Sequence, residues 1–172
     1  MKFILLLTFI GTTSLVHAQT VDLEQMKINQ TIEYKLTLHE LLQSDLKIDS
    51  IIPVPEIMDM STADSLIYVG RSYFKYYSNL GSCIIGVIEF DGRISEVRMG
   101  DLILTNKTTV DLVGEYFPEN CHEINPIQVY QNSNSYSVCS IPISANGELT
   151  DNKLIFFFLE GKLARIDFWE PS

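Results

Sequence analysis

One segment of the chain places a nucleophile beside a base. Cys121, His122 and Glu123 are consecutive, and a cysteine thiolate activated by a histidine is the nucleophile of cysteine hydrolases. Neighbouring side chains on an extended segment point in opposite directions, however, so an adjacent cysteine and histidine do not readily form that pair. A zinc site built on Cys121, His122 and Cys139 would need a fourth ligand and closer spacing. Phosphate-binding glycine loops and nucleophile-elbow strings do not occur in the sequence, so we expect no enzyme, no metal and no cofactor.

The start of the chain has the pattern of a secretory signal. Lys2 precedes an apolar run over residues 3–10, and small residues occupy the positions expected before a cleavage after Ala18. We therefore expect a signal peptide, residues 1–18, and an exported domain, residues 19–172, located in the periplasm or secreted. No later apolar run approaches the roughly 18 residues that a membrane-spanning helix needs, so no membrane span is expected.

The charge of the chain is strongly acidic. It contains 12 lysine and arginine residues against 22 aspartate and glutamate residues. The expected signal peptide contains Lys2 and no acid, so cleavage would leave 11 basic and 22 acidic side chains and a net charge of −11. Nucleic acid and anionic membranes would repel such a protein. The charge itself does not name a partner, because an acidic balance usually serves solubility.

Three cysteines lie in the expected mature domain, Cys83, Cys121 and Cys139. Cysteines of exported proteins tend to pair, and the odd number leaves one over. We favour a disulfide between Cys121 and Cys139, which would stabilise the fold by about 3 kcal/mol by restricting the unfolded chain. Cys83, in an apolar run, would then be a buried thiol. A pairing through Cys83 stays open on the sequence alone.

The pattern of apolar residues predicts an α+β fold in which short helices pack on an antiparallel β-sheet. Thr37 and Glu40 have the spacing of a capping box, and leucines at helical spacing follow until about Asp45. A second helical pattern begins after Thr109 and stops before Pro118. Alternating runs predict strands, with an extended but weakly patterned lead-in before them. The expected strands cover residues 31–36, 65–78, 83–90, 93–99, 102–105, 127–130, 136–143 and both arms of a hairpin over 154–169.

Two features recur at a similar distance along the chain. Thr37 and Thr109, which begin the expected helices, are 72 residues apart, and the turn glycines Gly92 and Gly161 are 69 residues apart. These offsets predict a tandem duplication of a unit made of one helix and three or four strands, within one compact domain. Two hairpins with an acidic residue before the turn glycine would also look alike without duplication. The two halves would span about 31–104 and 105–172.

The expected strand 65–78 offers a first candidate binding surface. Its alternation places Arg71, Tyr73, Lys75 and Tyr77 on one face. Tyrosine and arginine provide large contact areas and directed hydrogen bonds, so this face is a candidate for binding another protein. The alternative is a solvated strand face on which the tyrosines lie flat.

The aromatic run near the end of the chain offers a second candidate. Phe156 and Phe158 would lie on one side of their strand, and Ile155, Phe157 and Leu159 on the other. If helices cover only one face of the sheet, aromatic side chains face water and mark a partner site. A strand that is buried on both faces is the alternative. A third possibility is that Phe156 and Phe158 line a pocket for a small apolar ligand between the sheet and the helices.

The layout of the chain resembles two known groups of proteins. An exported acidic chain of two tandem helix-plus-antiparallel-sheet units, with a cysteine pair in the second, is similar to the β-lactamase-inhibitory proteins and to the small outer-membrane assembly lipoproteins. The inhibitors carry a cysteine pair in each half, whereas the first half of this chain has only Cys83. The lipoproteins carry an acylated cysteine, which this sequence lacks. The resemblance implies a fold more than a function.

The sequence therefore predicts an exported, non-catalytic module that binds another protein through a sheet face, as an inhibitor, an immunity protein or an envelope-assembly factor would. The candidate binding residues are Arg71, Tyr73, Lys75, Tyr77, Phe156 and Phe158. A small apolar ligand is the alternative, and a hydrolase that uses Cys121 and His122 is a distant third.

Overall fold

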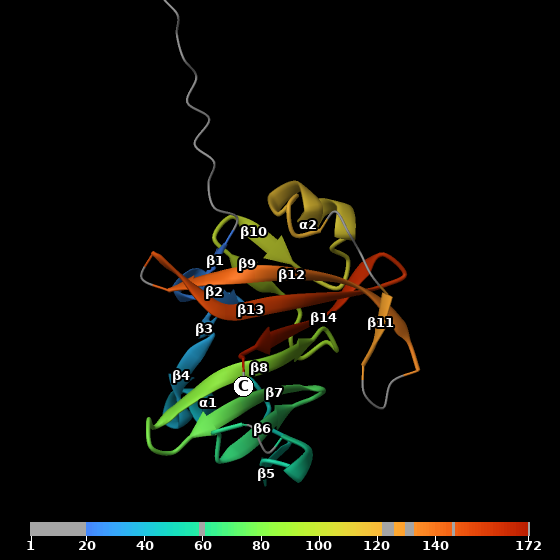
Figure 1. The fold of residues 1–172 in the computed structure, drawn as a ribbon. Coiled ribbons are helices and arrows are strands. Elements are labelled where there is room, and N and C mark those ends of the chain that lie inside the picture. Colours follow the sequence, from blue (N-terminus) through green and yellow to red (C-terminus); the bar gives the residue numbers. More distant parts are fainter. Residues whose placement is uncertain (1–19, 59–60, 122–125, 130–132, 146, 172) are drawn as a thin grey trace, which may run out of the picture.

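The computed structural model describes residues 20–58, 61–121, 126–129, 133–145 and 147–171 (Figure 1). The expected signal peptide lies outside these residues and stays a prediction. The described part of the chain forms two β-sheets, two short α-helices and two short 3-10 helices. In chain order these are β1 (Val21–Asp22), η1 (Leu23–Gln25), β2 (Met26–Ile28), β3 (Ile32–Glu33), β4 (Lys35–Thr37), α1 (Leu38–Gln43), β5 (Ser50–Pro53), η2 (Glu56–Met58), β6 (Ser65–Val69), β7 (Ser72–Tyr77), β8 (Ser82–Glu89), β9 (Val97–Met99), β10 (Leu102–Leu104), α2 (Val110–Tyr116), β11 (Pro126–Gln128), β12 (Ser135–Ala145), β13 (Glu148–Leu159) and β14 (Lys162–Trp169).

The larger sheet is made of two antiparallel meanders placed edge to edge. Its strands follow the order β1-β12-β13-β14-β8-β7-β6-β5, with β11 also paired to β12 and β4 also paired to β8. The first meander is β5 to β8 and the second is β11 to β14. They join where β14 pairs antiparallel with β8, so the last strand of each meander lies at the centre of the sheet (Figure 1).

A short helix precedes each meander, as the sequence predicts. Thr37 caps α1 in a complete capping box with Glu40, and the Thr109 hydroxyl accepts a hydrogen bond from the Leu112 backbone N–H at the start of α2. Thr37 also pairs with the first residue of β8, and Thr109 bridges to the first residue of β14. The order of one helix followed by a four-stranded antiparallel meander therefore occurs twice.

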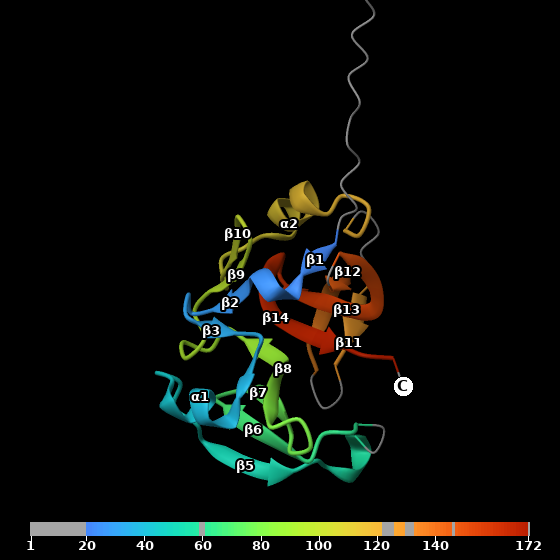
Figure 2. The same ribbon diagram turned by 90° about the vertical axis from the view of Figure 1, so that its left-hand side faces the viewer.

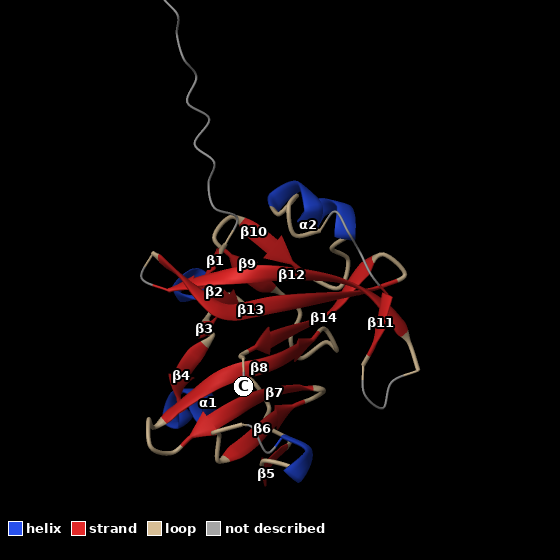
Figure 3. Ribbon diagram, in the orientation of Figure 1, coloured by secondary structure: helices blue, strands red, loops and turns tan. Residues whose placement is uncertain are grey.

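The second sheet is small, with the order β10-β9-β2-β3. Figure 2 shows this sheet and α1 on one side of strands β14, β8 and β7, with β11 and the end of the chain on the other side. The apolar core fills the space between the two sheets and includes Ile28, Phe74, Ile94, Phe156 and Phe158, each at most 1% exposed. Figure 3 shows how small the helical part is beside these strands.

The lead-in before α1 is more structured than its polar pattern indicates. Met26 and Ile28 in β2 are 1% and 0% exposed and belong to the core. The strand pairs with β3 and with β9, so it holds the small sheet together. Two buried side chains in a three-residue strand leave too short an alternation to detect from sequence.

The expected single strand over 65–78 is wrong, because the chain reverses at Gly70 and forms the hairpin β6–β7. Gly70 has a φ of +63°, in the left-handed region that favours glycine. Its N–H donates to the Asp49 carboxylate at 2.7 Å, and the Arg71 N–H donates to the Asp91 carboxylate at 2.9 Å. A Cβ at Gly70 would lie 2.0 Å from Oδ2 of Asp91, so only glycine fits this turn.

The expected hairpin around Gly92 is also wrong. Strand β8 ends at Glu89 in the large sheet, whereas β9 pairs with β2 and β10 in the small sheet. The chain between them crosses from one sheet to the other, and buried Ile94 lies on that crossing. Gly161 forms the turn between β13 and β14, the last two strands of the second meander. The corresponding turn of the first meander, between β7 and β8, is at Gly81. The alignment of Gly92 with Gly161 therefore fails.

Candidate functional site: the open face of the large sheet

One face of the large sheet packs against the core. On the opposite face, which we call the open face, the described residues form no second sheet. Five of its residues are at most 7% exposed but lie outside the core cluster. The strand register brings one row of side chains across six strands of this face. The row consists of Tyr68, Tyr73, Val87, Asp167, Ile155 and Ser140. The five buried residues are Leu66, Tyr77, Val87, Tyr136 and Phe157.

Tyrosines occupy the part of the open face that the first meander provides. The rings of Tyr68 and Tyr73 are 5.7 Å apart between centroids and tilted by 55°. Tyr73 lies over Gly86, where an added Cβ would be 2.3 Å from the ring carbon Cε2. Burial, followed by the nearby Asp167 charge, raises the pKa of Tyr73 to about 12. Tyr73 is thus a neutral hydroxyl on a ring that its neighbours hold in place.

Charged side chains occupy the middle of the open face, where the two meanders join. Arg165 contacts Asp167 through two hydrogen bonds of 2.5 and 2.8 Å, and its Nη1 lies 3.6 Å from Oε1 of Glu89. Arg71, in the β6–β7 turn, reaches the other oxygen of Glu89 at 3.0 Å. The guanidinium of Arg165 also covers the ring of Phe157, 5.6 Å from its centroid. Burial raises the pKa of Asp167 even though Arg165 lowers it.

A second ion pair lies where β7 approaches the end of β14. Lys75 is 9% exposed, and its Nζ lies 2.8 Å from Oε2 of Glu170. Tyr77 also hydrogen-bonds the Glu170 side chain, and burial together with that carboxylate raises the pKa of Tyr77 to about 12. Near the same end of β14, Lys153 covers the ring of Trp169, which is 42% exposed.

The structure brings together the four residues expected on strand 65–78. Tyr73, Lys75 and Tyr77 lie on the open face. Arg71 lies in the β6–β7 turn and contacts this face through its ion pair with Glu89. The sequence expectation places Tyr68 on the opposite side from Tyr73, because it treats both as parts of one strand. A turn at Gly70 is the signal that would have paired them. Arg165 and Asp167, which β14 contributes, form the centre of the site.

Phe156 and Phe158 are not part of this face. They are 0% and 1% exposed and belong to the core between the two sheets. Their neighbour Phe157 is the aromatic residue that faces the open side, and it makes an edge-to-face contact with Tyr136 at 5.9 Å. Three pockets lined by described residues involve neither Phe156 nor Phe158. One of them, about 480 Å³, lies between β3, β4 and α1 and is lined by Ile32, Leu36, Glu33 and Glu40 among others.

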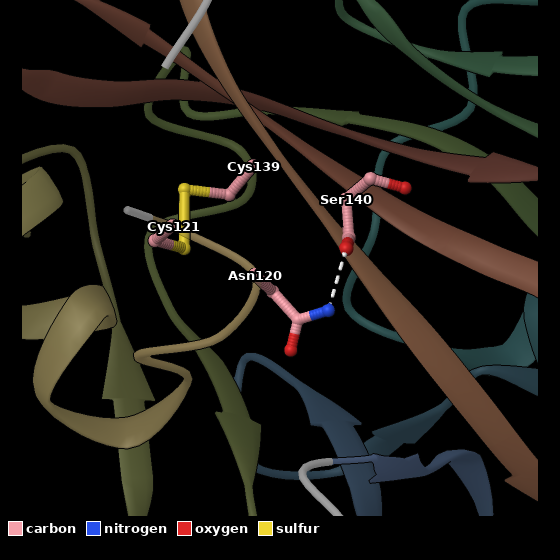
Figure 4. The surroundings of a disulfide bond; sticks show 4 residues. All are labelled: Asn120, Cys121, Cys139 and Ser140. Atoms are coloured by element: carbon pink, nitrogen blue, oxygen red, sulfur yellow. Dashed lines mark hydrogen bonds between the residues drawn. A yellow bond between two sulfur atoms is a disulfide. The ribbon is translucent and has the colours of Figure 1, made fainter. Parts of the chain in front are cut away.

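The predicted disulfide between Cys121 and Cys139 is confirmed, with the two Cα atoms 5.0 Å apart. Figure 4 shows the bond beside a hydrogen bond of 3.1 Å from Nδ2 of Asn120 to the Ser140 carbonyl. A disulfide-bonded cysteine has no thiolate, so Cys121 cannot act as a nucleophile in this state. His122 and Glu123 lie outside the described residues.

Cys83 is a free, buried thiol, as expected, and burial raises its pKa to about 11. Within the described residues, no group of three histidine, cysteine, aspartate or glutamate side chains is placed to hold a metal ion.

Comparison with known proteins identifies no relative: no protein-family model, no curated protein and no solved structure matches this sequence. The resemblance in layout to the β-lactamase-inhibitory proteins and the small assembly lipoproteins therefore stays a prediction. None of the described helices is long and apolar enough to cross a membrane.

Proposed function

We propose that this protein is an exported, non-catalytic module that binds another protein through the open face of its large sheet. The observation that supports this most directly is the composition of the face. The paired tyrosines Tyr68 and Tyr73 of the first meander and the pair of Phe157 and Arg165 in the second lie on this one face, and no second sheet formed by the described residues covers them. These residue types contribute most to the affinity of protein interfaces.

The rigidity of the open face also supports the proposal. Tyr73 is fixed over Gly86, and Arg165 is fixed by Asp167, Glu89 and Phe157. Side chains that are already ordered lose little conformational entropy when a partner binds. The confirmed disulfide agrees with an exported protein, because disulfides persist in oxidising compartments. The net charge of −10 disfavours nucleic acid as the partner.

The test is affinity capture with matched variants. The chain from Gln19 onward is immobilised, and proteins retained from the envelope and secreted fractions of the host are quantified. Tyr68→Ala combined with Tyr73→Ala should weaken retention of a stoichiometric partner at least about 30-fold, as expected for a pair of central interface residues. Tyr116→Ala is the control, because Tyr116 is 46% exposed on α2, away from the open face.

Two outcomes would contradict the proposal. A partner retained equally well by the double variant and by Tyr116→Ala would not use the open face. Folded protein that retains no host protein would leave no partner for that face. In either case circular dichroism must first establish that each variant keeps its sheet structure.

The two other functions considered from the sequence have less support. A pocket for a small apolar ligand between sheet and helices would need Phe156 and Phe158, and both are packed in the core. A hydrolase would need the thiolate of Cys121, which the disulfide removes. Failure of the folded protein to retain a fluorescent apolar probe would count further against the first.

We also propose that the two halves arose by tandem duplication, with an alignment that differs from the one expected from Gly92. Gly81 and Gly161 each turn the last hairpin of a meander with a positive φ, of 61° and 76°. Thr37 and Thr109 cap the two helices, and each pairs with the strand that follows its turn glycine. The repeated order and these matching contacts support a common origin of the halves.

A further inference from the structure

Lys75 is the charged group on the open face with the least access to solvent. Its side chain is 11% exposed, and its Nζ contacts Oε2 of Glu170, 95 positions further along the chain, at 2.8 Å. Tyr77, on the same face of β7, hydrogen-bonds the same side chain. Two neighbouring donors of one strand thus hold a single carboxylate.

Ser82 provides a third donor in the same corner of the face. The register of β7 and β8 places Ser82 directly opposite Tyr77, and directly paired residues of adjacent strands project to the same face. Ser82 is 6% exposed, and its Oγ has no hydrogen-bond partner among the described residues. A buried hydroxyl without a partner is unfavourable. A carboxylate, with acceptor positions for about four hydrogen bonds, could satisfy all three donors.

Glu170 is the replaceable member of this contact. It follows Trp169, the last residue of β14, and takes no part in strand pairing. Its side chain is 36% exposed, compared with 11% for Lys75. The next residue, Pro171, is exposed and has no backbone N–H to anchor the segment. Lys75, by contrast, is fixed in the middle of a paired strand and needs a negative partner whenever water is excluded from it.

We propose that the protein partner of the open face inserts an aspartate or glutamate side chain at Lys75, Tyr77 and Ser82, in the place that Glu170 occupies. This inference rests on the proposed function and names the chemistry of the partner. The net charge of −10 makes the rest of the protein surface unfavourable for an acidic side chain of a partner. The site at Lys75, Tyr77 and Ser82 instead offers a buried cation and two hydroxyl groups. The partner is therefore a protein that presents an acidic side chain on its contact surface.

The carboxylate site can be tested before a partner is known, with acetate as the probe. In the variant Glu170→Ala, the Cε–Hε signal of Lys75 in an NMR spectrum should shift saturably as sodium acetate is added. In the unchanged protein Glu170 competes, so the same titration should shift the signal much less. Sodium chloride at equal ionic strength should cause no saturable shift.

A matched control uses Lys27, which pairs with Glu33 at 2.6 Å on the surface, where the two side chains are 34% and 61% exposed. Removal of that partner in Glu33→Ala should not create a saturable acetate site, because Lys27 is already solvated. If Lys75 in Glu170→Ala responds only as Lys27 does, the carboxylate site is overturned.

The role of Ser82 has its own test. In the Glu170→Ala background, Ser82→Ala should weaken acetate binding about three- to tenfold, the range expected for one hydrogen bond. An unchanged acetate affinity would overturn the assignment of Ser82 to the site. Because Ser82→Ala removes only one oxygen, folding is not at risk in this comparison.

Once capture identifies a partner, two variants separate the two proposals. Lys75→Met should weaken its binding at least about 30-fold, because it leaves the partner's carboxylate buried without a counter-charge. Glu170→Ala should strengthen binding, because it removes the competitor. If the Tyr68 and Tyr73 variants lose the partner but Lys75→Met binds it normally, the carboxylate site is overturned and the proposed function of the open face still holds. If acetate binds saturably but the tyrosine variants still bind every partner, the proposed function is overturned instead.

Discussion

Phe156 and Phe157 are adjacent in β13 and face opposite sides of the large sheet, yet they are 0% and 5% exposed. Phe156 is surrounded by the apolar core between the two sheets. Phe157 is covered by the guanidinium of Arg165 and the ring of Tyr136. The comparison teaches that burial on a sheet face does not require a second layer, since long polar side chains can cover apolar rings with their stems. A partner can contact such a cover directly, whereas it cannot reach the side chains of a packed core.

The sharpest test of this difference is truncation of each ring. Phe156→Ala should lower the free energy of unfolding by about 3–5 kcal/mol, because it opens a cavity that the surrounding core cannot close. Phe157→Ala should cost about 2 kcal/mol, because Arg165 can move into the space and water can reach it. Urea unfolding of both variants measures the difference. Equal losses would mean that the open face is packed as tightly as the core.

The disulfide between Cys121 and Cys139 is attached to the core, since Cys139 is 0% exposed and part of the core cluster. Replacement of both Cys121 and Cys139 by alanine should lower the free energy of unfolding by about 3 kcal/mol, through the larger entropy of the unfolded chain. Thermal unfolding with and without reductant checks this: the reductant should destabilise the unchanged protein and leave the double variant unaffected. A reductant effect on the double variant would contradict the assignment to this bond.

A substitution beneath Tyr73 should disturb the open face alone. Gly86→Ala places a Cβ 2.3 Å from the Tyr73 ring, and the forced displacement should cost about 1–3 kcal/mol. Tyrosine fluorescence and partner binding should change together. The control is Gly114→Ala in α2, where the nearest atom to an added Cβ is 3.9 Å away. That change should stabilise the protein by about 0.5–1 kcal/mol, because alanine favours a helix.

The smallest expected effect is a difference in pH dependence between Asp167 and Asp91. Burial raises the pKa of Asp167 above its ordinary value of 3.8, so the folded state binds the proton more tightly than the unfolded state. Its contribution to stability therefore falls as pH rises from about 3.8 through the raised pKa. Backbone hydrogen bonds from Arg71 and Arg93 outweigh burial at Asp91 and lower its pKa, so its contribution is lost as pH falls through that lowered pKa.

Urea unfolding at several acidic pH values measures these slopes. Relative to the unchanged protein, Asp167→Asn should gain stability as pH rises above 3.8. Asp91→Asn should lose stability, relative to the unchanged protein, as pH rises toward 3.8. Slopes of the same sign in both variants would show that the two aspartates do not differ in this way.

The helices and the disulfide could be predicted because their signals are local or few. Thr37 and Glu40 specify a capping box three residues apart, and a chain with three cysteines offers only three pairings. The strand over 65–78 could not be read correctly, because the alternation of side chains continues through the Gly70–Arg71 turn without a visible break. A glycine there is also compatible with a continuous strand, and the carboxylates that bind the turn, those of Asp49 and Asp91, are about 20 positions away in the sequence.

The candidate site was predicted in part for a related reason. Tyr73, Lys75 and Tyr77 lie on one short strand, where the period of two fixes their common face. Tyr68, Arg165, Asp167 and Glu89 reach that face from other strands, and their positions depend on the register of β6, β8 and β14. Nothing in a single sequence reveals that Glu89 lies opposite Arg165.

The sequence by itself predicted the local elements of this protein: two capped helices, the turn at Gly161, the alternation of side chains in β13 and, as the favoured one of three pairings, the disulfide between Cys121 and Cys139. Each follows from interactions within a few residues or from a very small number of choices. The tertiary structure decided that β14 joins β8, that β9 leaves for a second sheet, and that Glu170 meets Lys75. Those contacts link residues far apart along the chain, and their free energy depends on the burial of the whole sheet rather than on any local pattern.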